Sequence, residues 1–154
     1  MLNLISYPFQ TAQYIEDALG DVSSSVFALL GQGIAALNVN NNWAGSLEAF
    51  EGANGYWLVA LEDFSFSFNG FDGGIARKAV QPAIRPVPAL YSFTQSSKQA
   101  FYFIESAIIK GQPLDSEDII IAYNGDVVVG SRYWNGEYTD VPALGYDEHS
   151  KNEG

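Results

Sequence analysis

Alternation of apolar and polar side chains is the dominant pattern along the chain, and it predicts β-strands. Residues Phe64-Ser65-Phe66-Ser67-Phe68 alternate throughout, which places three phenyl rings on one face of an extended segment and two hydroxyls on the other. Apolar or aromatic runs typical of further strands occupy residues 2–7, 26–30, 56–61 and 99–109.

Turn signals divide these strands at short intervals. Asn-Gly, which supplies the positive φ angles of two-residue hairpins, occurs at residues 54–55, 69–70, 124–125 and 135–136. The clearest hairpin joins 118–123 to 126–134, and the next Asn-Gly leads into 137–141. The C-terminal part is therefore predicted to be a three-stranded meander.

One short helix interrupts the strand pattern, from Ala12 to Leu19. Thr11 is its expected N-cap, and Gly20 fits the position just past its end. The predicted fold class is all-β: a β-sandwich, or two small packed antiparallel sheets, with this one helix.

Composition and charge narrow the function classes. The chain has 154 residues and a formal net charge of −11, so we expect no binding to nucleic acid, which depends on Lys and Arg. It has no Cys, which excludes disulfide scaffolds and thiolate nucleophiles. Its one His, His149, is expected to be solvated, which disfavours a His-bearing catalytic triad. No apolar run reaches about 20 residues, so no membrane insertion is expected.

Charge is unevenly distributed and suggests a domain plan. Residues 1–76 carry eight acids and no Lys or Arg, whereas 77–98 contain four of the seven basic residues and no acid. With three prolines, the segment 77–98 is predicted to be an extended basic connector. It would join an N-terminal β module, 1–76, to a C-terminal β module, 99–154. The sequence is also compatible with one compact domain. The candidate assembly contacts within it are Arg77, Lys78 and Arg85, which would dock on an acidic neighbour such as another copy.

Two motifs have both a functional and a structural interpretation. Residues 31–36, Gly-Gln-Gly-Ile-Ala-Ala, match the spacing of a dinucleotide fingerprint, but the asparagines that follow leave no room for its helix, so we predict a glycine turn. Acidic groups are compatible with a carboxylate-based glycosidase or with calcium, the only cofactor considered, although solvated turns explain them more simply. The candidate calcium ligands are Asp115, Glu117 and Asp118.

Aromatic residues offer a third candidate site. Trp43 and Trp134 lie next to Asn-containing turns and are expected to be exposed, where they would stack on sugar rings. With Tyr133 and Arg132 they define a candidate glycan-binding surface. Trp57, inside an apolar strand, is expected to be core.

Two stretches carry a family resemblance. Four segments resemble a β-rich module of surface and secreted proteins of marine bacteria: Leu4-Ile5-Ser6-Tyr7-Pro8, residues 27–36, Trp43-Ala44-Gly45-Ser46-Leu47 and Gly55-Tyr56-Trp57-Leu58. Residues 99–103, 111–114, 121–126 and 129–132 resemble its usual companion, and similar segments occur in predicted virion proteins of marine phages. The resemblance implies architecture and surface location, and it supplies no catalytic residues.

These observations favour a non-catalytic structural or adhesive module on the exterior of a larger assembly. The expected location is a virion, as a phage capsid decoration or tail fibre protein, or the extracellular side of a cell surface. The chain starts without a basic leader, which favours a virion component. The expected partners are proteins, including further copies of the chain in a homo-oligomer. The alternative is a carbohydrate-binding module, and a glycosidase comes third.

Overall fold

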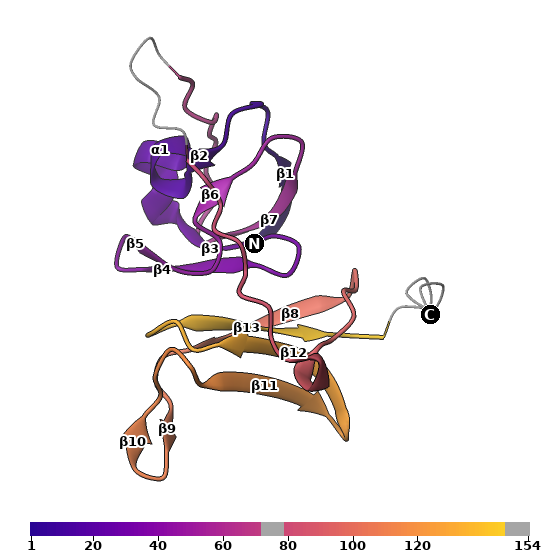
Figure 1. Ribbon diagram of the computed structural model, residues 1–154. Coiled ribbons are helices and arrows are strands. Elements are labelled where there is room, and N and C mark those ends of the chain that lie inside the picture. The colour runs from indigo at the N-terminus through magenta and orange to yellow at the C-terminus, as the bar shows by residue number, and fades with distance from the viewer. Residues whose placement is uncertain (72–78, 147–154) are drawn as a thin grey trace. The chain divides into compact units, whose positions relative to one another are not determined.

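A computed structural model describes residues 1–71 and 79–146 (Figure 1). The chain divides into two compact units, Met1–Ala83 (unit 1) and Ile84–Gly154 (unit 2). Strands account for 42% of the structure and helical turns for 10%, so the all-β prediction is confirmed. None of the helices within the described ranges is long and apolar enough to cross a membrane.

Unit 1 is built on one antiparallel sheet. Its strands lie in the order β1 (Leu2–Ser6), β7 (Gly55–Ala60), β3 (Val26–Leu30), β4 (Ala35–Val39) and β5 (Asn42–Gly45) (Figure 1). A separate short ribbon pairs β2 (Gln13–Tyr14) with β6 (Ala49–Phe50). Helix α1 (Ile15–Leu19) and the 3-10 turn η1 (Gly20–Ser25) connect β2 to β3.

An aromatic core lies on one face of this sheet. Tyr7 stacks on Phe50 with ring centroids 5.5 Å apart, and Phe68 meets both rings edge-on. Phe64, Phe66 and Phe68 all pack against this core, as their alternation predicts. Within the part of the chain that the structure describes, residues 64–68 nevertheless join no sheet; they contribute rings instead of ladder hydrogen bonds.

The helix is shorter than its sequence signals predict. It begins at Ile15, and Tyr14 precedes it with no side-chain cap bond. Thr11 is not the cap; its carbonyl oxygen accepts a hydrogen bond from the Tyr7 hydroxyl at 3.0 Å. Gln13 and Tyr14 are extended and not helical because they pair with β6. Gly20 ends the helix with a φ of 52°, which is the expected role of this glycine.

The glycine motif at 31–33 is a turn, as predicted. The Gly31 amide donates to the Ile34 carbonyl at 2.8 Å, and Gly33 has a φ of 71°. The next element is strand β4, antiparallel to β3, and not the helix that a dinucleotide site needs.

The described residues of unit 2 form three antiparallel ribbons. They pair β8 (Gln99–Ile104) with β13 (Thr139–Leu144), β11 (Ile119–Asn124) with β12 (Val127–Tyr133), and β9 (Ile108–Ile109) with β10 (Gln112–Pro113). A 3-10 turn, η2 (Ala89–Tyr91), precedes them. The β11–β12 loop is Gly125–Asp126, one residue later than predicted, and Gly125 supplies its positive φ of 60°.

The predicted meander is wrong in its last pairing. Strand β13 takes β8 as its ladder partner instead of β12. Strands β12 and β13 still approach closely. The Pro142 carbonyl occupies the space where a Gly130 side chain would begin, which only glycine permits. Proline has no amide donor, which is consistent with the pairing of β13 on one side only. The two ribbons therefore pack against each other instead of forming one sheet.

The predicted connector is shared between the units. Gln81 belongs to unit 1, where its amide nitrogen donates to Ser46 O at 2.6 Å and its Oε1 accepts from the amides of Glu48 and Ala49. In unit 2, the carbonyl of Tyr91 accepts a hydrogen bond from the Ser131 hydroxyl at 2.7 Å. The boundary thus falls between Ala83 and Ile84, inside the predicted connector.

Candidate functional site

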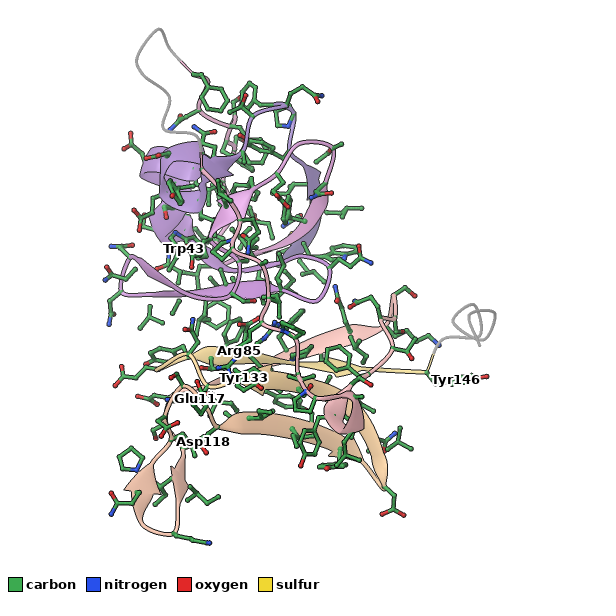
Figure 2. All side chains as sticks on the ribbon, viewed as in Figure 1. Trp43, Arg85, Glu117, Asp118, Tyr133 and Tyr146 are labelled. Carbon is green, nitrogen blue, oxygen red and sulfur yellow. The ribbon has the colours of Figure 1, made fainter. Side chains whose placement is uncertain are left out.

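Three residues that the sequence assigns to separate functions meet in one cluster of unit 2. The Arg85 guanidinium forms a two-pronged ion pair with Glu117, at 3.0 and 2.8 Å, and its carbon atom lies 3.8 Å from the centre of the Tyr133 ring. The same guanidinium donates to Ser116 O at 3.0 Å. Figure 2 shows Arg85, Tyr133 and Glu117 close together in unit 2. We call Arg85, Glu117 and Tyr133 the arginine cluster.

The electrostatics of the arginine cluster follow from this geometry. The hydrogen bond to Glu117 raises the pKa of Arg85, and the same contact holds the pKa of the Glu117 carboxyl below its ordinary value. Arg85, an expected assembly contact, therefore neutralises an acid of its own unit. The two other expected assembly contacts, Arg77 and Lys78, lie outside the described residues.

The candidate calcium ligands serve a turn. Asp118 Oδ2 accepts the amide of Asp115 at 2.9 Å, and Asp115 Oδ1 accepts the amide of Glu117 at 2.9 Å. Because these oxygens accept from backbone amides and Glu117 faces Arg85, the three carboxylates do not converge. Across residues 1–71 and 79–146 no group of three or more acidic or His side chains is placed to hold a metal ion.

Arg132, a candidate glycan contact, lies in the interior of unit 2. Its guanidinium forms an ion pair with Asp140 at 3.2 Å, and its Nε donates to the Asp140 carbonyl at 3.0 Å. Both side chains are buried. The pair links β12 to β13, so this charge acts between strands and not at a ligand surface.

The tryptophans differ from expectation in their exposure. Trp43 packs against the core of unit 1, with its indole nitrogen donating to Ser23 Oγ at 3.0 Å, and Trp134 is partly buried. Trp57, expected to be core, is 40% exposed. It lies between the fully buried Tyr56 and Leu58 on β7, so the alternation of the strand directs Trp57 to the outer face of the sheet.

An apolar outer face is the feature that the sequence did not reveal. Trp57 pairs with Leu4 on β1 and with Leu30 on β3, so these side chains share the face opposite the core. Leu4 is 66% exposed, and Leu2, two residues earlier on β1, is also exposed. We call Leu2, Leu4, Leu30 and Trp57 the outer face. Its signal in the sequence is that β1 and β7 are apolar on both sides.

A groove lies beside the same edge of unit 1, on the core side of the sheet. It encloses about 390 Å³ between Ile5 of β1, Leu58 of β7, and Phe64 and Phe66 of the following segment. The carboxylates Glu62 and Asp63 also line the groove, and both residues are exposed.

No family model matches the chain, and neither a curated protein nor a solved structure matches it. The resemblance to surface modules therefore stays a prediction.

Proposed function

We propose that the protein is a non-catalytic structural or adhesive module that works by packing against other proteins, including copies of itself, on the exterior of a larger assembly. The observation that carries this proposal is the outer face, where Leu2, Leu4 and Trp57 are exposed side by side on paired strands. Contiguous apolar surface of this kind marks protein interaction sites more often than single exposed leucines do.

Unit 2 supports the same conclusion. Tyr102 on β8 and Tyr123 and Val127 on the β11–β12 hairpin are each more than half exposed. Among the described residues, strands β8 and β11 each have one ladder partner, so each leaves a strand edge that another protein could cover. Contact with a further protein surface would remove these side chains from water and stabilise the ribbons.

The expected setting is a virion or a cell surface. The resemblance of residues 99–103 and 121–126 to surface and virion modules supports this setting. The exposed apolar and aromatic side chains, which suit contacts with other proteins, support it as well. We expect the protein to serve as a capsid decoration, a fibre component or a cell-surface module, with no catalytic activity of its own.

Sedimentation of the purified protein over a range of concentrations tests the proposal. We expect concentration-dependent self-association that Leu4→Gln weakens by about tenfold or more, because burying one leucine contributes about 1.5–3 kcal/mol. Leu61→Gln is the matched control, since Leu61 is 64% exposed against 66% for Leu4 but follows β7 and lies outside the outer face. Equal effects of the two substitutions would argue against the outer face as a contact.

A glycan array run in parallel tests the carbohydrate alternative. Binding to a glycan that disappears in Trp134→Ala would overturn the structural role in favour of sugar recognition. The proposed function predicts no such binding.

A further inference from the structure

Hairpin β9–β10 is an exposed apolar segment of unit 2. Ile109 pairs with Gln112 and Ile108 with Pro113, and all six residues from 108 to 113 are exposed. Ile108 and Ile109 remain 74% and 54% exposed. Figure 1 shows the hairpin extending away from the other strands of unit 2. We call residues 108–113 the arm.

The arm has a defined shape and two unlike faces. Lys110 and Gly111 form its two-residue turn with φ angles of 51° and 80°, the positive pair that a type I′ turn requires. Directly paired residues share a face of a ribbon. One face therefore carries Ile108 with Pro113 and is entirely apolar, whereas the other carries Ile109 with Gln112, and Lys110 stands at the tip.

The groove of unit 1 is complementary to the apolar face and the charged tip of the arm. Its 390 Å³ are walled by Ile5, Leu58, Phe64 and Phe66, with Glu62 and Asp63 beside them. This volume falls within the roughly 300–1,000 Å³ typical of binding pockets. Glu62 accepts a hydrogen bond from Ser25 Oγ at 2.8 Å, and no Lys or Arg occurs anywhere from residue 1 to 76. Met1 also lines the groove, and its α-ammonium group donates to the Ala60 carbonyl at 2.7 Å. The two carboxylates of Glu62 and Asp63 outnumber this one cation, so the groove favours a positive group brought by another molecule.

We propose that the arm of one copy docks in the groove of a second copy, with Ile108 and Pro113 against the apolar walls and Lys110 facing Glu62 and Asp63. This inference rests on the proposed function and names one contact through which copies assemble. Because the arm belongs to unit 2 and the groove to unit 1, the contact joins unlike surfaces. Such contacts build rings when the rotation closes and filaments when it does not.

The two isoleucines of the arm allow a sharp test by sedimentation of the full chain. Ile108→Ser is expected to weaken self-association by about tenfold or more, because it removes the apolar anchor. Ile109→Ser, the same substitution one residue away on the opposite face, is the matched control and is expected to change it less than threefold. Circular dichroism verifies that both variants keep the fold.

A charge exchange tests the groove. Lys110→Glu and the pair Glu62→Lys/Asp63→Lys are each expected to weaken association, and combining them in one chain is expected to restore it. Added salt should weaken the wild-type contact, since the charged groups are exposed.

Mixing tests whether arm and groove meet between copies. The Ile108→Ser chain keeps an intact groove, and the Glu62→Lys/Asp63→Lys chain keeps an intact arm. With Leu4→Gln added to both chains to weaken the outer-face contact, each alone is expected to be monomeric, and an equimolar mixture is expected to form a dimer that grows no further. A mixture that stays monomeric would overturn the contact between arm and groove.

The remaining outcomes separate this inference from the proposed function. Self-association that Ile108→Ser leaves intact and Leu4→Gln abolishes would overturn the docking of the arm and retain the structural role. A wild-type chain that stays monomeric at all concentrations would overturn both.

Discussion

At the residue scale, the ion pair between Arg85 and Glu117 joins two opposite charges that are distant in the sequence. The guanidinium is held by a carboxylate on one side and by the Tyr133 ring on the other, and a planar guanidinium suits both contacts. The pair is exposed and is therefore a weak source of stability. Its measurable consequence is the titration of Glu117.

We predict that Glu117 titrates below the ordinary glutamate pKa of 4.5, because Arg85 stabilises the charged carboxylate. The stability that this group contributes is fully present above pH 4.5 and is lost as the pH falls through its lower folded-state pKa. Carbon-detected NMR titration of the Glu117 carboxyl measures it. In Arg85→Gln the pKa should rise toward the ordinary value; identical titrations in the two proteins would contradict the role of Arg85.

We predict that Arg132→Met destabilises unit 2 by about 3–5 kcal/mol, because it leaves the buried Asp140 carboxylate without its ion-pair partner. Urea unfolding measures the loss. Adding Asp140→Asn removes the uncompensated charge and should recover part of the stability. An Arg132→Met protein as stable as the wild type would show that the pair does not matter to the fold.

At the element scale, the close approach of β12 and β13 depends on one missing side chain. Gly130 has the backbone carbonyl of Pro142 where a Cβ would stand. The neighbouring Ser131 and Arg132 hold the same region through Tyr91 and Asp140. A backbone atom cannot rotate away as a flexible side chain can, so the two ribbons must separate to accept any larger residue.

We therefore predict that Gly130→Ala lowers the free energy of unfolding of unit 2 by about 1–3 kcal/mol. Gly55→Ala is the control: Gly55 also lies in a strand, but its nearest neighbour would be Ile5 O at 3.6 Å, an ordinary contact. We expect Gly55→Ala to change stability by less than about 1 kcal/mol. Thermal melts followed by circular dichroism compare the two variants, and equal losses would count against the packing of β12 on β13.

Local signals predicted the elements better than they predicted their partners. The alternation at 64–68 identified the inward rings, and Gly20 and Gly31 marked real turns, because each depends on nearby backbone geometry. The ladder of β13 with β8 was missed, since Asn135-Gly136 indicates a turn but not which strand follows it into a sheet.

The arginine cluster was missed as a unit because its members are brought together only by the tertiary fold, although each is a separate candidate in the sequence. Trp57 was misplaced because β7 is apolar on both faces, and sequence alone does not show which face is covered.

At the scale of the whole molecule, the division into two units predicts separate unfolding transitions. Leu29→Ala removes a fully buried side chain from unit 1 and should destabilise that unit by about 2–5 kcal/mol. Unit 2 should be unaffected. Trp134 is the one tryptophan of unit 2, so fluorescence of a Trp43→Phe/Trp57→Phe background reports on unit 2 alone. A shift of the Trp134 signal in Leu29→Ala would mean that the units unfold together.

The charge distribution of unit 1 has a consequence for its cleavage by proteases. No Lys or Arg occurs between Met1 and Ala76, so a trypsin-like protease finds no bond to cut within this stretch, even when the chain is unfolded. Amine-directed labels likewise find no lysine there, whereas Lys110 at the tip of the arm is exposed. Resistance of residues 1–76 to this class of protease is thus determined by the sequence itself, and the cleavage sites of unit 1 are confined to Arg77 and Lys78.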